Sequence, residues 1–361
     1  MSTASTTDTQ TDALQSDDLA AQCVDIARRA KAASRLLGTL DTNVKDQWLI
    51  ESADALIDAS DAIIAANQLD LENAPKYGLT EAGIDRLRLD EARIAGIATG
   101  LREIASLNDP IGEVLDGFAR PGGMRIEKRR VPLGVVFFIY ESRPNVTADA
   151  AGICVKSGNA VILRGGKEAA HSSRAIIEVL HEVGRRVGIP EDAVQLVGTT
   201  DRAAVGHFLK QADHIDVTIP RGGENLIRRV AAEATMPVIK HYDGNCHVYV
   251  DESADIEMAV DIIENAKCQR MGVCNACESL LIHQSIAAEA LPAIAKRLSS
   301  RGVEMRVDKR AAAYVPDGVP ASDADFAAEF LGPQISIAVV DSLDAAADHI
   351  NHYGSGHTDA I

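Results

Sequence analysis

Apolar residues recur at helical spacing through the first third of the chain. Between Leu19 and Leu107, Leu, Val, Ile and Ala return every three or four positions, and polar residues fill the positions between them. This periodicity, with Thr80 as a candidate N-cap, is typical of amphipathic helices that must cover another layer. It predicts helical stretches over 17–40, 43–74 and 80–107.

The pattern changes after Asn108. Residues 124–131 alternate Met, Ile and Val with Arg, Lys and Glu, which predicts an exposed β-ribbon. Beyond Pro132, the run 135–140 (VVFFIY) is apolar throughout, which is typical of a strand buried in a parallel sheet.

Strands then alternate with helices to the end of the chain, in two series that meet near His241. Such alternation predicts an α/β architecture of two doubly wound domains. The further strands are expected at 160–164, 194–197, 214–219, 237–241, 246–250, 279–283, 303–307 and 334–340. The helices between them are expected at 146–158, 168–186, 201–211, 224–234, 255–267, 286–299 and 342–353.

The composition excludes several classes of protein. The 53 acidic residues outnumber the 36 Lys and Arg, and the resulting net charge of −17 argues against nucleic acid as the main partner. No stretch approaches the ~20 apolar residues of a membrane helix, and the N-terminus lacks the basic and apolar parts of a secretory signal. Residues 1–18 are small, polar and acidic, and predict a disordered tail.

Cys274 is the first candidate for chemistry. It follows a loop segment, 270–273, between a predicted helix and a predicted strand, and Gly272 gives access to its backbone. The neighbouring cations Lys267 and Arg270 would favour its thiolate form, which is the nucleophile. The six cysteines show no disulfide framework, so we expect a cytoplasmic protein.

Other interpretations of this thiol stay open. Most single cysteines are inert packing residues. Cys274 and Cys277 also form a C-x-x-C pair, which a redox disulfide would explain. No second pair or spaced set of histidines follows, so we expect no metal site.

The segment 140–145 (YESRPN) follows a predicted strand and leads into a helix. Ligands of open α/β sheets bind beyond the carboxyl ends of the strands, so the Asn145 amide is placed to donate to an oxyanion. The alternative is that Asn145 caps the helix.

Two turns carry Arg beside a pair of glycines. Arg164-Gly165-Gly166-Lys167 follows a strand and precedes a helix, and Arg221-Gly222-Gly223 repeats the arrangement. Backbone N–H groups and cations at the start of a helix favour binding of a phosphate. Neither turn fits the G-x-G-x-x-G motif. The alternative is that both turns are ordinary connections between a strand and a helix.

Taken together, these motifs resemble the gamma-glutamyl phosphate reductases, a branch of the aldehyde dehydrogenase superfamily. The segments YESRPN, LRGGKE, IPRGG, CNA and HTDAI occur in that order, and the resemblance covers roughly residues 20–361. It implies reduction of L-glutamyl 5-phosphate to glutamate 5-semialdehyde and phosphate with NADPH, in proline biosynthesis. It also implies an aldehyde dehydrogenase-like fold.

The resemblance implies roles for individual residues. Cys274 matches the nucleophile and Asn145 the oxyanion-hole amide, and both arginine-glycine turns match cofactor-binding positions, with Lys167 as a contact of the 2′-phosphate. The residues that we assign to the substrate are Arg143, His241, Arg270 and Asn275.

The resemblance also implies the domain organisation. We expect a small β-ribbon for oligomerisation at 120–132, an NADPH-binding domain at 19–119 and 133–240, and a catalytic domain at 241–361. The expected partners are a second copy of the chain, as a homodimer or higher homo-oligomer, and glutamate 5-kinase for channelling.

Two departures from the family pattern matter. Oxidising relatives carry a glutamate 33 residues before the nucleophile as the base for deacylation, and here His241 stands in that place. A reductase must not activate water, because hydrolysis would discard the acyl group. Members of the family also continue past HTDAI, whereas this sequence stops at Ile361, so we expect the catalytic domain to be incomplete. The alternatives are an oxidising aldehyde dehydrogenase and a non-catalytic homologue.

Overall fold

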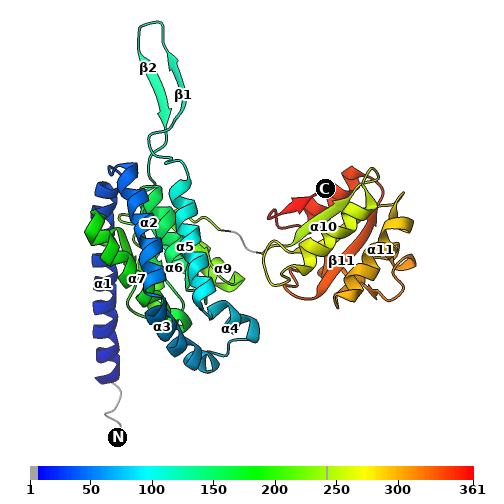
Figure 1. Cartoon of the computed structure of the whole chain (residues 1–361), viewed down its shortest axis with the longest axis horizontal. Coiled ribbons are helices and arrows are strands. Elements are labelled where there is room, and N and C mark those ends of the chain that lie inside the picture. Colours follow the sequence, from blue (N-terminus) through cyan, green and yellow to red (C-terminus); the bar gives the residue numbers. More distant parts are fainter. Residues whose placement is uncertain (1–6, 241–242) are drawn as a thin grey trace. The chain divides into compact units, whose positions relative to one another are not determined.

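The computed structural model describes residues 7–240 and 243–361. The chain divides into two compact units, an N-terminal unit, 1–240, and a C-terminal unit, 241–361. Each unit is built around a parallel sheet (Figure 1).

The N-terminal unit has a sheet with the strand order β5-β4-β3-β6. Its strands are β3 (Val135–Tyr140), β4 (Ala160–Arg164), β5 (Val194–Leu196) and β6 (Val217–Arg221). Its helices are α1 (Thr7–Leu37), α2 (Thr42–Asp58), α3 (Ser60–Asn73), α4 (Glu81–Leu87), α5 (Glu91–Ser106), α6 (Asn145–Lys156), α7 (Ala170–Val187), α8 (Ala203–Phe208) and α9 (Glu224–Glu233).

Both faces of this sheet are buried, which explains the apolar run of β3. Successive side chains of a strand point to opposite faces. Val136 and Tyr140 pack with α2, α5, α6 and α7, whereas Phe137 and Ile139 pack with α1 and α8. The predicted doubly wound arrangement is therefore confirmed in this unit.

The helical boundaries differ from the prediction in two ways. Helix α1 begins at Thr7 rather than near residue 17, so the expected tail is helical from Thr7 onward, and residues 1–6 lie outside the described residues. No glycine or proline interrupts the sequence between Thr7 and Leu37, so nothing local ends the helix. The two longer predicted stretches are each broken, at Ala59 and at 88–90. Thr80 is confirmed as an N-cap, since its side chain accepts from the Gly83 N–H at 3.2 Å.

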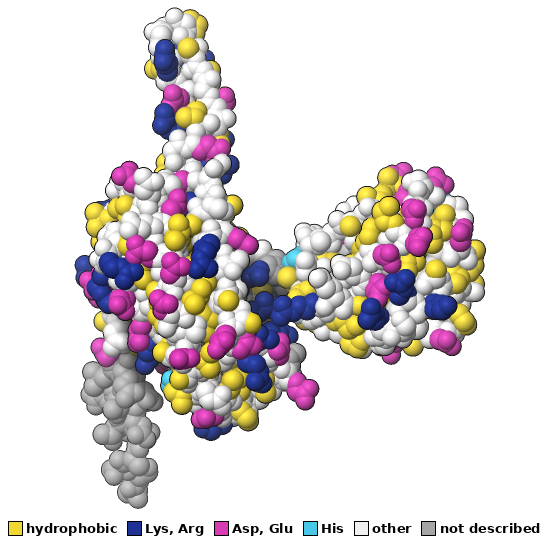
Figure 2. All heavy atoms as spheres, in the orientation of Figure 1, with side chains coloured by type: hydrophobic (Ala, Val, Ile, Leu, Met, Phe, Trp, Pro, Cys, Tyr) yellow, Lys and Arg dark blue, Asp and Glu magenta, His cyan; other side chains and the backbone are white. Residues whose placement is uncertain are grey.

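The β-ribbon is longer than predicted and begins earlier. β1 (Val114–Ala119) pairs antiparallel with β2 (Arg125–Arg129), so the ribbon includes residues assigned to the domain at 19–119. The turn closes where Arg120 N–H donates to Met124 O at 2.8 Å and Gly123 adopts φ +84°. The hairpin extends away from the helices, and hydrophobic and charged side chains alternate along it (Figures 1 and 2).

One predicted strand is wrong. Of the predicted residues 237–241, Val238 forms an isolated parallel bridge with Thr218 beside β6, and His241 lies outside the described residues. Thr218 N–H donates to Pro237 O and Ile239 N–H to Thr218 O. Proline lacks an N–H, so the ladder does not extend further toward the N-terminus.

The C-terminal unit has a sheet with the strand order β10-β9-β11-β8-β7-β12, and its pairs are parallel. Its strands are β7 (Cys246–Val250), β8 (Cys277–His283), β9 (Glu304–Val307), β10 (Val319–Pro320), β11 (Gln334–Val340) and β12 (Asp359–Ala360). Its helices are α10 (Ile256–Cys268), α11 (Ala287–Ser300), α12 (Asp323–Phe326) and α13 (Leu343–Tyr353).

This sheet is also covered on both faces. Leu280 and Ile282 of β8 pack with α10 and α11, and Leu281 packs with α12 and α13. In the part of the chain that the structure describes, no helix has the length and apolar character needed to span a bilayer.

Candidate active site

Cys274 lies in the loop between α10 and β8, and its side chain is partly exposed. The two cysteines near it in the sheet are buried. Burial raises the pKa of the Cys246 thiol to about 11 and that of the Cys277 thiol to about 12, so both stay protonated near neutral pH. The packing interpretation therefore fits Cys277, and Cys274 is the accessible member of the C-x-x-C pair.

The backbone behind Cys274 is held closely. Its carbonyl oxygen accepts from the Cys246 Sγ at 3.2 Å, and a Cβ on Gly244 would lie 1.8 Å from the same oxygen. Gly244 in turn donates its N–H to Glu329 Oε1 at 3.0 Å. A side chain larger than that of glycine would force this segment or the Cys274 loop to move.

The two cations expected near Cys274 have different environments. Lys267 is fully buried and forms an ion pair with Glu278, with 2.5 Å between Nζ and Oε2. Lys267 therefore shares its charge with a carboxylate, as a buried ammonium requires. Its expected effect on the Cys274 thiol stays a prediction. Arg270 and Asn275 lie exposed in the loop beside Cys274.

Asn145 is the first residue of α6, just beyond the carboxyl end of β3. Pro144 occupies the N-cap position and no side chain caps this helix, so the capping interpretation of Asn145 is wrong. The Asn145 Nδ2 instead donates to Asp149 Oδ2 at 2.9 Å, and burial raises the pKa of that carboxyl. The contact orients the amide. Arg143 lies two residues earlier and is partly buried.

Arg164 is buried at the end of β4. Its guanidinium donates to the carbonyl oxygens of Gly165 and Thr200, the latter at 2.9 Å, and so ties the glycine turn to the loop after β5. Gly165 packs against the Tyr140 ring, where a Cβ would lie 3.2 Å from the ring. Lys167 is exposed and its Nζ lies 4.5 Å from the centre of the Tyr77 ring.

The second arginine-glycine turn joins β6 to α9 and already holds a carboxylate. Gly223 N–H donates to Glu141 Oε2 at 3.2 Å, and a Cβ on Gly222 would lie 2.6 Å from the Glu141 carboxyl carbon. Because the start of a helix favours negative charge, the turn has the properties of an anion site.

A cleft of about 200 Å³ lies beside the first turn. Gly165 and Gly166 form one wall, and α7 contributes Ser173, Arg174 and Glu178, which recur at helical spacing. The loop after β5 adds further residues, Thr199 and Thr200. Sequence reasoning missed the α7 residues, although their spacing behind the glycine turn is a usable signal.

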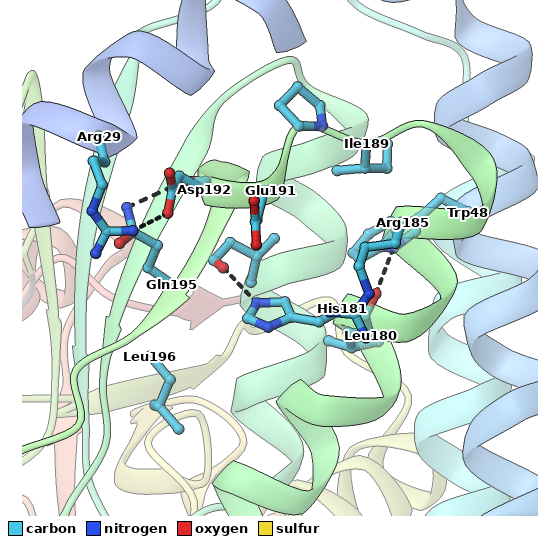
Figure 3. Close-up of a pocket in the computed structure, with 13 residues that line it drawn as sticks. Arg29, Trp48, Leu180, His181, Arg185, Ile189, Glu191, Asp192, Gln195 and Leu196 are labelled. Carbon is cyan, nitrogen blue, oxygen red and sulfur yellow. Dashed lines mark hydrogen bonds and ion pairs between the residues drawn. The ribbon is translucent and has the colours of Figure 1, made fainter.

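A second cavity, of about 250 Å³, is drawn in Figure 3 and shares His181 and Leu196 with the lining of this cleft. Its polar groups are largely paired. Arg29 pairs with Asp192, the Trp48 indole donates to Leu180 O at 3.1 Å, and His181 Nε2 contacts Val194 O at 2.7 Å.

The site residues fall in both units. Asn145, Arg143 and the two glycine turns belong to the N-terminal unit, and Cys274, Arg270 and Asn275 belong to the C-terminal unit. His241 lies outside the described residues. Within the described ranges, no group of three or more His, Cys, Asp or Glu could hold a metal ion.

Comparison with known proteins identifies close relatives. Residues 7–313 match the aldehyde dehydrogenase family. The chain is 96% identical, over all of its length and 83% of the relative, to a gamma-glutamyl phosphate reductase of Rhodopirellula baltica. It is 49% identical to that of Caldanaerobacter subterraneus, over 93% of this chain and 81% of the relative.

A solved structure is also similar. The crystal structure of gamma-glutamyl phosphate reductase from Thermotoga maritima superposes with a TM-score of 0.89 at 40% identity. The match covers 94% of this chain and 82% of that chain.

Proposed function

Because this chain belongs to the aldehyde dehydrogenase family, we propose that it reduces L-glutamyl 5-phosphate to L-glutamate 5-semialdehyde and phosphate with NADPH, a step of proline biosynthesis. The observation that carries the proposal is the accessible thiol of Cys274, next to buried thiols that cannot ionise near neutral pH. The substrate follows from the name of the 96% identical relative.

Cys274 acts as the nucleophile in this proposal. Its thiolate attacks the carbonyl carbon of the acyl phosphate, the bond to phosphate breaks, and the glutamyl group remains on sulfur as a thioester. Phosphate is a good leaving group and needs charge stabilisation rather than a strong acid. We assign that role to Arg143 and Arg270, and substrate contacts to Asn275 and His241.

Asn145 stabilises the oxyanion. Its amide Nδ2, oriented by Asp149, donates to the oxygen that gains charge when the thioester carbon becomes tetrahedral. NADPH supplies the hydride for reduction of the thioester. Collapse of the oxyanion then returns the electron pair to sulfur and releases the aldehyde.

The N-terminal unit fits a dinucleotide phosphate. The Gly223 N–H donates to the Glu141 carboxylate, which supports an anion-binding role for this turn. Arg174 and Lys167 are exposed at or near the cleft beside Gly165 and Gly166, where they would meet a 2′-phosphate. Arg164 would support this region through its contacts with loop carbonyls.

The ribbon supports assembly of more than one copy. Leu115, Phe118, Met124 and Ile126 are exposed along β1, β2 and their turn, and exposed apolar side chains on an extended hairpin are typical of a contact with another chain. We propose a homodimer or higher homo-oligomer. All six cysteines are free in the structure, which supports the cytoplasm as its location. We also propose glutamate 5-kinase as the source of the substrate.

A phosphate-dependent assay tests the function. The reverse reaction is followed as formation of NADPH from glutamate 5-semialdehyde and NADP⁺, with phosphate varied. We expect turnover that requires phosphate, because the thioester can leave the enzyme only by transfer to phosphate. Sustained turnover without phosphate would indicate an oxidising dehydrogenase instead.

A further inference from the structure

The loop that carries Cys274 is closed at its base by a buried ion pair. Lys267 lies in the last turn of α10 and Glu278 is the second residue of β8, so the two flank the loop 269–276. Their charged atoms lie 2.5 Å apart and both side chains are 0% exposed. We propose that the Lys267–Glu278 pair is a positioning device that fixes the Cys274 loop for catalysis. This inference rests on the proposed role of Cys274.

The other carboxylate oxygen of Glu278 contacts a further segment, the loop that contains Leu331. Oε1 accepts from the Leu331 N–H at 3.0 Å. Leu331 has φ +50°, in the left-handed region that residues other than glycine rarely adopt, so the hydrogen bond helps to hold an unfavourable conformation. The carbonyl oxygen of Leu331 faces Gly272 in the nucleophile loop, where a Cβ would lie 3.9 Å from it.

The segment 329–331 links the ion pair to the backbone of Cys274. Leu331 is two residues from Glu329, which accepts from the Gly244 N–H. Gly244 packs directly on the Cys274 carbonyl oxygen. The pair therefore fixes the loop at its base, and the 329–331 segment connects it to the contact behind the nucleophile.

Stability alone does not account for this pair. Removing two charges from water is costly, and replacing a buried ion pair with apolar residues of similar size is often neutral or stabilising. An ion pair differs from an apolar contact because its interaction is directional. It therefore fixes the distance and angle between the two segments that it joins. Nucleophilic attack depends on such placement, and an error of 1 Å can cost about 10²-fold in rate.

The test removes both charges together. The double variant Lys267→Met, Glu278→Leu keeps the volume of the pair and leaves no unpaired charge. We expect its thermal midpoint to stay near that of the wild type, its kcat to fall by about 10² and its KM to change little. The rate of alkylation of Cys274 by iodoacetamide, followed by peptide mass, should change as well.

A partly buried ion pair in the N-terminal unit provides the control. Lys156 and Asp46 in the N-terminal unit lie 2.5 Å apart, with 4% and 27% exposed side chains. The variant Lys156→Met, Asp46→Leu should leave the alkylation rate of Cys274 unchanged, because the pair joins segments of the N-terminal unit, where Lys156 also donates to Ala105 O at 2.9 Å.

Two results would overturn the inference. One is a Lys267/Glu278 double variant whose kcat and Cys274 alkylation rate stay within twofold of the wild type. The other is loss of the fold in that variant, which would assign the pair to stability. Measuring the alkylation rate needs no substrate. It therefore tests the positioning role of the pair even if the phosphate-dependent assay refutes the proposed function.

Discussion

The carbonyl oxygen of Cys274 accepts a hydrogen bond from the Sγ of Cys246 at 3.2 Å, although the two residues are 28 positions apart. Cys246 begins β7, and Gly244 just before it packs on the same oxygen. The peptide of Cys274 is thus supported by the start of a neighbouring strand. Changes in this strand should alter catalysis without touching substrate.

The variant Gly244→Ala tests that support. A Cβ there would lie 1.8 Å from the Cys274 carbonyl oxygen, so the Cys274 loop or the segment around residue 244 must move. We expect kcat to fall on the order of 10²-fold, because misplacement by about 1 Å has that effect. Steady-state kinetics of the phosphate-dependent reaction would measure it.

Gly96→Ala is the matched control. Gly96 is exposed in α5, where a Cβ would meet nothing within 4 Å. Alanine there should stabilise the helix by about 0.5–1 kcal/mol and leave kcat unchanged. Equal kinetics in the two variants would contradict a role of Gly244 in placing Cys274.

Asn145→Ala tests the proposed oxyanion donor. Loss of one such donor typically lowers kcat by about 10²–10³, so the variant should remain measurably active. Asp149→Leu, which removes the acceptor that orients the amide, should show part of the same loss. Asp149→Asn keeps an acceptor oxygen and should retain more activity than the leucine variant. Wild-type kcat in Asn145→Ala would remove this residue from the mechanism.

Glu141→Ala tests the anion site at the start of α9. The Glu141 carboxylate occupies the Gly223 N–H that a cofactor phosphate would use. Removing this charge should lower the KM for NADPH by roughly two- to fivefold, the range expected for an exposed charge interaction. Glu233→Ala, at the other end of α9, is the control and should not change this KM. A higher KM in Glu141→Ala would mean that Glu141 helps to bind the cofactor.

We predict that titration of His349 makes the stability of the C-terminal unit depend on pH. Burial, aided by the nearby His247 and His352, lowers the pKa of His349 from 6.5 to about 4. The unfolded chain therefore takes up a proton at a higher pH than the folded chain. The stabilisation is complete above pH 6.5 and is lost as the pH falls toward 4, by on the order of 3 kcal/mol.

The variant His349→Phe removes this titration and keeps an aromatic ring beside Phe326 and Tyr353. Urea unfolding of both proteins between pH 4 and pH 7 would measure the effect. The wild type should lose more stability than the variant over this range. An identical pH dependence would refute the assignment to His349.

The sequence was sufficient for the fold class because the signals are local. The run 135–140 is apolar at every position, and both faces of β3 are indeed buried. β1 of the ribbon was missed because its sequence, VLDGFA, has no clear alternation, and its pairing depends on the turn at 121–123. Residues 237–241 resemble a strand in composition, but whether they pair depends on the neighbouring edge of the sheet.

In the candidate site too, some features follow from the local sequence and others depend on contacts made only in the folded chain. The position of Cys274 in a loop follows from the elements on either side. The burial of Lys267 does not, because its partner Glu278 comes into reach only when α10 packs on β8. The orientation of Asn145 by Asp149 depends on a side-chain contact across one turn, which competes with capping in any sequence-based interpretation. The roles of these residues stay predictions.

The most direct test of the account is the identification of a glutamyl thioester on Cys274. The enzyme would be mixed with glutamate 5-semialdehyde and excess NADP⁺ without phosphate, quenched in acid and digested, and its peptides weighed. We predict one burst of NADPH per active subunit, with the glutamyl mass on the Cys274 peptide, and its disappearance when phosphate is added before the quench. A burst with no adduct on Cys274, or an adduct on another cysteine, would contradict the account.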